Sequence, residues 1–231
     1  MRSISSDYIE PSPRGAGPDP AAVPVRATGD MRPGYRPRLA TLEKSREIRE
    51  IAARYIAGHG VWRFSMLSLA RHLNCLLPTL CYYYKKREEL IADIVLRHVE
   101  TLRSRVGLAM DEAEDESPAG EVRAFAREYL LAALAEQDFH CLATIYMGLA
   151  GPEDGQAFAA RREALREIAE SRLTAHAPSL AGKPETARAL SQALIDSLGG
   201  AAVWLEPYGV VKPVAFAAMV ADWVLDAAAR A

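Results

Sequence analysis

The segment from Ile48 to Ile91 constrains the fold of this chain more than any other stretch. It carries three short apolar repeats at helical spacing, separated by residues that commonly end or begin helices. Gly58 and Gly60 follow the first repeat, and glycine adopts the backbone angles needed to leave a helix. Ser65 offers a capping hydroxyl to the second, and Pro78 suits the first turn of the third, where no N–H is needed. This order predicts a helix-turn-helix braced by a preceding helix.

Residues 39–105 also resemble the N-terminal domain of the TetR family of transcriptional regulators. The matching pieces are, in order, IAARYIAGHG, FSMLSLARHL and PTLCYYYKKREELI. The resemblance implies an all-α homodimer, with one small domain for double-stranded DNA and a larger domain for a small-molecule effector and the partner subunit. It also implies two helix-turn-helix units in successive major grooves of a near-palindromic operator.

Composition and helical periodicity divide the chain into three parts. Residues 1–35 are rich in proline and glycine and poor in large apolar side chains, so we expect a flexible N-terminal arm. Residues 36–105 form the expected DNA-binding domain with its linking helix. Residues 106–231 form the expected ligand-binding and dimerisation domain, in which every apolar pattern is helical.

Charge is distributed unevenly between the two domains. Residues 36–105 contain 14 Lys or Arg against 7 Asp or Glu, whereas residues 106–231 contain 10 against 19. A basic N-terminal part favours a polyanionic partner that only this part binds. An unevenly charged, solvated surface would explain the same numbers, but the helix-turn-helix pattern favours DNA.

Candidate DNA contacts surround the second and third helices of this segment. Lys85 and Lys86 form with Arg87 a basic cluster after the third helix, suited to phosphate contacts. By resemblance, Ser65, Thr79 and Arg87 occupy positions that meet DNA in the family. Tyr82 and Tyr83 could also meet DNA, or they could instead pack between helices. The complete candidate set is Arg63, Ser65, Arg71, Thr79, Tyr82, Tyr83, Lys85, Lys86 and Arg87.

Four positions depart from the family pattern within this segment. The family often has a basic residue at Leu67 and a serine at Leu76. It has a glycine at Asn74, although asparagine tolerates a left-handed turn. Its usual tyrosine at Cys81 is shifted here to Tyr82. The third helix therefore begins with apolar residues, which favours apolar contact with thymine methyl groups or weakened base-specific binding.

The C-terminal part offers an aromatic set for an apolar cavity with a few polar groups, as small-molecule sites are built. Each of these residues could instead belong to the core. The candidates are Phe125, Tyr129, Phe139, His140, Tyr146, Met147 and Trp204. Small residues at 198–203, facing the last helix, are expected to form the homodimer interface.

Other classes of function find little support in the sequence. His140, Cys141 and His176 show no repeated metal-ligand spacing, and no nucleophile motif is present, so we expect neither a metal, a cofactor nor an enzyme. The sparse cysteines fit a reducing cytoplasm, and no apolar run is long enough for a membrane span. The sequence therefore predicts a ligand-responsive transcriptional repressor. A divergent member that acts through protein–protein contacts is the main alternative, and a helical enzyme or binding protein is the other.

Overall fold

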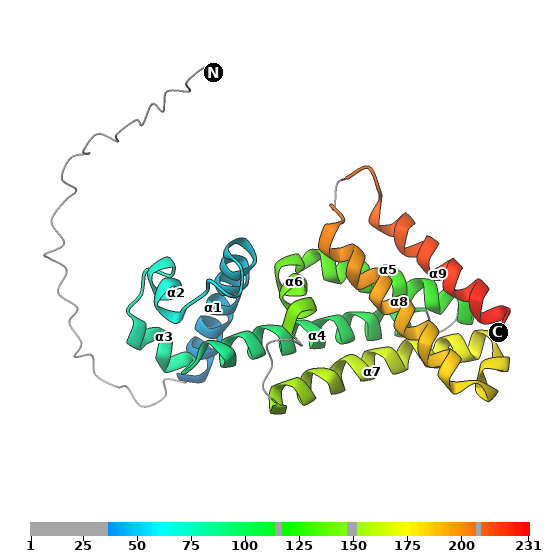
Figure 1. The fold of residues 1–231 in the computed structure, drawn as a ribbon, viewed down its shortest axis with the longest axis horizontal. Coiled ribbons are helices and arrows are strands. Elements are labelled where there is room, and N and C mark those ends of the chain that lie inside the picture. Colours follow the sequence, from blue (N-terminus) through cyan, green and yellow to red (C-terminus); the bar gives the residue numbers. More distant parts are fainter. Residues whose placement is uncertain (1–36, 114–116, 147–151, 207–208) are drawn as a thin grey trace, which may run out of the picture. The chain divides into compact units, whose positions relative to one another are not determined.

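All regular structure in the described residues is helical, as the sequence predicts. The computed structural model describes residues 37–113, 117–146, 152–206 and 209–231, so the expected N-terminal arm lies outside the described residues. Residues 38–231 form one compact unit. The elements, shown in Figure 1, are α1 (Pro37–His59), α2 (Met66–His72), α3 (Leu77–Tyr83), α4 (Arg87–Glu112), α5 (Pro118–Ala135), α6 (Gln137–Tyr146), α7 (Pro152–His176), the 3₁₀ turn η1 (Pro178–Gly182), α8 (Pro184–Trp204) and α9 (Pro213–Ala229).

The helix-turn-helix forms where the capping and turn residues place it. The Ser65 side chain accepts a hydrogen bond from the Ser68 N–H at 3.1 Å, and the Ser68 side chain accepts one from the Ser65 N–H at 3.1 Å. This capping box satisfies two backbone donors at the start of α2. Asn74 adopts the left-handed conformation, with φ of 51°, in the turn before α3. Pro78 lies in the first turn of α3, and Leu76 caps that helix without a side-chain hydrogen bond.

A buried charge cluster fixes α1 against α3 and α4. The Tyr84 hydroxyl donates to Asp93 Oδ2 at 2.6 Å, and Arg49 Nη1 donates to the same oxygen at 3.0 Å. Arg97 donates to the second carboxylate oxygen at 2.7 Å. Burial opposes ionisation of Asp93, but these partners outweigh it and lower the pKa of its carboxyl. A fully paired charge can remain in this half-buried position.

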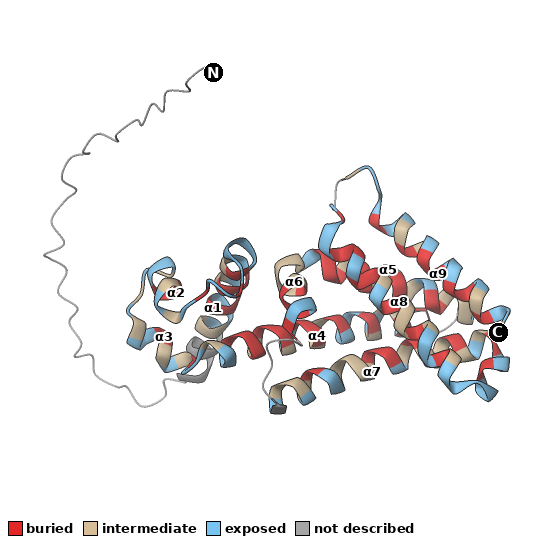
Figure 2. Ribbon diagram, in the orientation of Figure 1, coloured by how far each residue is buried: buried red, intermediate tan, exposed pale blue. Residues whose placement is uncertain are grey.

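The core around α1–α4 includes side chains from beyond residue 105. Leu142, Ala143 and Tyr146 of α6 and Phe158 of α7 pack with it, whereas Leu102 of α4 belongs to the C-terminal core. Figure 2 shows that buried residues follow α4 along most of its length. The two hydrophobic cores therefore do not divide at the boundary expected between residues 105 and 106.

Two helices differ from the expected pattern. The linking helix α4 continues to Glu112, past the expected end at residue 105, because Val106 and Met110 extend its buried stripe. The segment from Phe139 onwards is apolar on nearly all sides in the sequence, which is typical of a buried helix, but Thr144 and Ile145 at the end of α6 are exposed.

The small residues expected at the dimer interface mostly pack inside their own chain. Leu198, Gly199, Ala201 and Ala202 are buried in α8, as are Ala217, Ala221 and Leu225 in α9. Only Gly200 and Val203 of the segment 198–203 are exposed. Their close packing therefore brings α5, α8 and α9 together within one chain, since all three pairs are in contact.

Candidate DNA-binding surface and ligand cavity

The predicted DNA contacts are mostly exposed around α2 and α3. The exposed members of the set are Arg63, Ser65, Arg71, Thr79, Tyr82, Lys85 and Lys86. The Ser65 hydroxyl also caps α2, so its capacity for a phosphate contact is shared with that helix. Leu67 and Leu76 are exposed on the same two elements, at 48% and 75% of their surface. The surface thus combines basic and polar groups with an unusual apolar component.

Tyr83 and Arg87 have structural roles as well. Tyr83 is half-buried against the N-terminal core, with its ring 5.2 Å from that of Tyr82 in an edge-to-face arrangement. Arg87 donates to the Phe64 carbonyl at 3.2 Å and pairs with Glu88 at 2.8 Å. Arg87 therefore joins the start of α4 to the loop before α2, a role that its place in a basic run did not indicate.

A cavity of about 280 Å³ lies among α4, α5, α6, α7 and α8. Its apolar wall is formed by Val99, Leu102, Ala143, Phe158, Leu165 and Ile195. Its polar groups come from His98, Tyr129, His140, Thr144, Arg162 and Asp196. A mostly apolar cavity with a few convergent polar groups is the usual form of a small-molecule site.

Of the predicted ligand residues that the structure describes, Tyr129 and His140 line this cavity. Phe125 is buried behind Tyr129, with ring centroids 6.1 Å apart. Tyr146 packs on Phe158 at 5.3 Å in the N-terminal core.

The remaining candidates lie elsewhere. Trp204 is exposed and contacts Phe216, with ring centroids 5.7 Å apart, because it stands at the solvent end of α8. Phe139 lines a separate groove, and Met147 lies outside the described residues.

Four of the six polar residues of the cavity were not predicted from the sequence: His98, Thr144, Arg162 and Asp196. His98 had a detectable signal, because it interrupts the apolar stripe of α4 between Val95 and Val99 and is fully buried. A buried polar side chain needs a partner, so its position suggests a built site. Arg162 and Asp196 are 34 residues apart and pair at 3.1 Å, a contact that periodicity does not indicate.

A hydrogen-bonded chain runs through the cavity wall. Glu136 Oε2 lies 2.8 Å from His98 Nδ1, His98 Nε2 lies 3.0 Å from His140 Nδ1, and His140 Nε2 lies 3.1 Å from the Gly199 carbonyl. Burial lowers the pKa of His140 to about 4 and raises the pKa of Tyr129 to about 12. Both side chains are therefore uncharged at neutral pH.

Gly199 makes room for this arrangement. A β-carbon at this position would lie 3.2 Å from the Tyr129 hydroxyl and 3.4 Å from His140 Nε2. The next residue, Gly200, has nothing within 4 Å of such an atom. The absence of a side chain at Gly199 therefore allows α8 to approach both polar groups closely.

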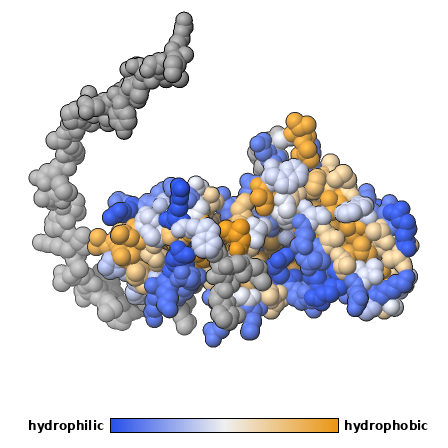
Figure 3. Space-filling model, viewed as in Figure 1, coloured by the Kyte–Doolittle hydropathy of each residue, from blue (hydrophilic) through white to orange (hydrophobic). Residues whose placement is uncertain are grey.

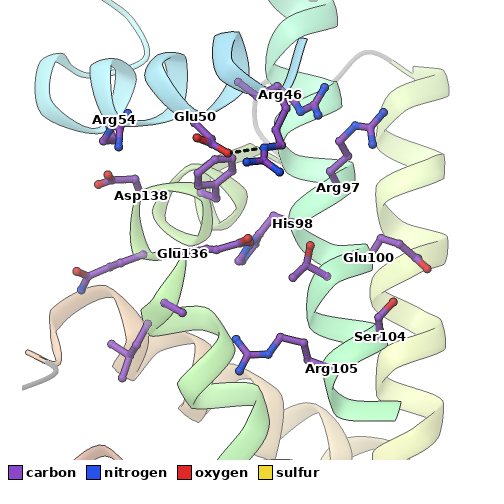
Figure 4. Close-up of a pocket in the computed structure, with 16 residues that line it drawn as sticks. Arg46, Glu50, Arg54, Arg97, His98, Glu100, Ser104, Arg105, Glu136 and Asp138 are labelled. Atoms are coloured by element: carbon purple, nitrogen blue, oxygen red, sulfur yellow. Dashed lines mark hydrogen bonds and ion pairs between the residues drawn. The ribbon is translucent and has the colours of Figure 1, made fainter. Parts of the chain in front are cut away.

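The other face of His98 borders an open groove of about 880 Å³ among α1, α4 and the α5–α6 junction. Figure 4 shows that its labelled side chains are mostly charged and come from all three regions, with Arg46 paired to Glu50 at 3.1 Å. Glu136 lies in this groove as well. His98 thus connects the groove beside α1 with the cavity.

Solved structures share the fold of this chain. The chain resembles a TetR-family regulator from Bordetella parapertussis 12822 with a TM-score of 0.72 and 20% identity, over 79% of this chain and 94% of the other. PfmR, a TetR-family regulator from Thermus thermophilus, gives a TM-score of 0.67 and 19% identity, over 78% of this chain and 97% of PfmR. AibR, solved in complex with isovaleryl coenzyme A and operator DNA, gives a TM-score of 0.61 and 18% identity, over 80% of this chain and 97% of AibR.

The fold is that of the TetR-family transcriptional regulators. No protein-family model matches the sequence, and no curated protein matches it. The TetR-family fold predicted from residues 39–105 is thus confirmed over most of the chain. Within the described ranges, no helix is both long and apolar enough to cross a membrane, and no cluster of His, Cys, Asp and Glu could hold a metal ion.

Proposed function

We propose that this chain is a ligand-responsive, DNA-binding transcriptional regulator of the TetR family, and that it acts as a repressor released from its operator by a small molecule. The observation that carries the proposal is the position of α4. At its start, Arg87 and Asp93 hold the helix-turn-helix, and further along, His98, Val99 and Leu102 line the cavity. A ligand that binds more tightly when α4 has one placement than when it has another would shift the protein towards that placement. This shift of α4 would move α2 and α3.

The partners that follow from this proposal are double-stranded DNA, a small-molecule effector and a second copy of the chain. The DNA would lie against the exposed residues of α2 and α3, with phosphates held by Lys85 and Lys86. Two copies would place two such surfaces on the half-sites of a near-palindromic operator. AibR, which has this fold, binds operator DNA and a coenzyme A ester, which supports the two kinds of ligand proposed here.

The dimer interface we propose is the exposed apolar surface of α8, of α9 and of residues 209–212, which precede α9. Its large members are Val203, Trp204, Val210, Val211, Val214, Met219 and Trp223. Figure 3 shows apolar surface gathered over this end of the molecule. Exposed apolar patches of this extent mark interaction sites.

Selection of host genomic fragments on the immobilised protein would test the proposal, followed by fluorescence anisotropy with the recovered DNA. We expect enrichment of a near-palindromic sequence that binds more tightly than scrambled DNA of the same length. Equal affinity for both, or no binding at low salt, would exclude a sequence-specific regulator.

The apolar groups around the helix-turn-helix favour a second candidate, a family member that acts through protein–protein contacts. Trp62, Leu67, Leu76 and Tyr82 are all exposed there, two of them where the family carries polar or basic residues. A protein partner would bury such side chains, whereas phosphates would not. In the anisotropy experiment, this candidate predicts weak binding that does not depend on sequence.

A further inference from the structure

The hydrogen bonds of His98 and His140 require more protons than two neutral imidazoles carry. One N–H must donate to the Glu136 carboxylate, one must donate to the Gly199 carbonyl, and one must lie between the two rings. That makes three protons on four ring nitrogens, whereas each neutral imidazole has only one N–H. The chain of three side chains therefore holds one additional proton.

This proton belongs to the histidine pair. Glu136 keeps 36% of its side chain exposed, so water stabilises its carboxylate as an anion. We place the charge on His98 because its Nδ1 lies 2.8 Å from the Glu136 carboxylate, whereas His140 contacts only His98 and the uncharged Gly199 carbonyl. The negative end of the chain then faces the groove, and the positive end lies in the cavity wall.

Two of the other polar groups of the cavity, Tyr129 and Arg162, can donate hydrogen bonds to a ligand. The Tyr129 side chain lines the cavity, and its hydroxyl makes no hydrogen bond to the described residues, so it is available to a ligand. Arg162 donates one N–H to Asp196 at 3.1 Å, and its other N–H groups remain available. The Thr144 hydroxyl donates to the Cys141 carbonyl at 2.7 Å, so towards a ligand it can only accept. The other acceptor, Asp196, is paired with Arg162 and is more than half exposed.

We propose that the cavity binds a small organic carboxylate, whose anionic group is received by Tyr129 and Arg162 and is stabilised by the proton that His98 and His140 share. This deepens the function proposed above, because the carboxylate would be the effector. The volume of about 280 Å³ lies at the lower end of the range for small-molecule sites. It suits a free acid with a short apolar chain, whereas the coenzyme A ester of that acid would extend far outside.

The charge state of the pair responds to groups on every element around it. In the cavity these are Tyr129, Arg162 and Asp196. In the groove they are Arg46, Arg49, Glu50, Arg54, Arg97, Glu100, Arg105, Glu136 and Asp138. When the additional proton is lost at higher pH, the positive charge near the ligand disappears. Affinity for a carboxylate should then fall, whereas affinity for an uncharged analogue should stay constant.

Isothermal titration calorimetry with a matched panel would test the ligand class. The probes are butanoate, hexanoate, octanoate and phenylacetate, each with its primary amide, its primary amine and its coenzyme A ester. We expect at least one acid to bind about tenfold more tightly than its amide, amine and ester, as charge-assisted hydrogen bonds would give. Amides, amines or esters that bind as well as the acids, or no binding by any acid, would overturn the proposal.

Two pairs of variants locate the site. Arg162→Gln should remove the preference for acid over amide, whereas Arg161→Gln, which changes a neighbouring arginine bonded to the carbonyl of its own helix, should retain it. Gly199→Ala should weaken binding because its β-carbon would crowd Tyr129 and His140. Gly107→Ala, whose β-carbon would have nothing within 4 Å and which does not line the cavity, should not. Equal effects within either pair would place the ligand elsewhere.

The proton is tested without ligand by nitrogen NMR of histidine-labelled protein. We expect one ring, assigned by its loss in His98→Gln, to show the two similar shifts of an imidazolium at neutral pH. Two neutral rings would overturn the proton assignment. In titrations against pH, the fall in hexanoate affinity should be present in the wild type and absent in His98→Gln.

DNA binding is measured separately, so the two proposals can fail independently. Carboxylate binding without sequence-specific DNA binding would remove the regulator and keep the site. Specific DNA binding with no preference for acids would do the reverse.

Discussion

Among single residues, His140 has the clearest consequence for the response of the fold to acid. Its ring lies between His98 and the Gly199 carbonyl, so a second proton on His140 would disrupt the contact with His98. Burial lowers its pKa to about 4, below the value of 6.5 for an unperturbed histidine. Between these two pH values the unfolded chain binds more protons than the folded one, so acid favours unfolding.

We therefore expect the free energy of unfolding to fall by about 3 kcal/mol through this residue as the pH drops from 6.5 to 4. Urea denaturation at several pH values in this range would measure it. Carboxylates also titrate between pH 4 and 6.5. The effect of His140 is therefore the difference between the wild type and His140→Gln in how the free energy of unfolding depends on pH. Parallel curves for the two proteins would contradict the prediction.

Tyr84 shows a different residue-level effect. Its hydroxyl donates to Asp93 at 2.6 Å, and burial raises its pKa to about 12. Tyr84→Phe leaves the half-buried carboxylate with one donor fewer, which we expect to cost about 1–3 kcal/mol of stability. Tyr82→Phe is the matched control, since the Tyr82 side chain is exposed. A Tyr84→Phe protein with the denaturation midpoint of the control would show that this hydrogen bond contributes little.

At the scale of elements, the starts of α2 and α3 could be predicted because their signals are local. Ser65 caps α2, Asn74 turns the chain, and Pro78 lies in the first turn of α3. The lining of the cavity could not be predicted in the same way. Tyr129 and Phe125 both lie on the buried side of α5, and only the approach of α8 at Gly199 decides which of them faces the cavity.

The elements α2 and α4 provide a prediction about DNA. Lys86 is exposed at the N-cap of α4, so Lys86→Ala should weaken binding to all sequences alike and lower the salt slope by about one unit. Leu67 is exposed in the first turn of α2, and Leu67→Arg should tighten binding by about 1–3 kcal/mol if it gains a base or phosphate contact. Fluorescence anisotropy across a salt series measures both. If neither variant differs from the wild type at low salt, the α2–α3 surface does not hold DNA.

For the whole molecule, the exposed face of α9 predicts assembly. Trp223 and Met219 are one helical turn apart, exposed by 61% and 58%. Trp223→Glu would place a charge inside an apolar interface and should shift the mass in solution from dimer towards monomer. Light scattering after size exclusion measures this, with Trp62→Glu on the other side of the chain as the control. A dimer that persists in Trp223→Glu would place the interface elsewhere.

The contribution of α6 and α7 to the N-terminal core limits how this chain could be rearranged, in evolution or by design. Leu142, Tyr146 and Phe158 close a core whose other side chains come from α1–α4. A hybrid that joins residues 36–105 to the effector half of another regulator would lose this closing surface, unless the new half offers matching side chains. The part proposed to bind DNA therefore cannot be exchanged as an independent unit. Exchange of operator specificity should succeed more readily by grafting the exposed residues of α2 and α3 onto an intact chain.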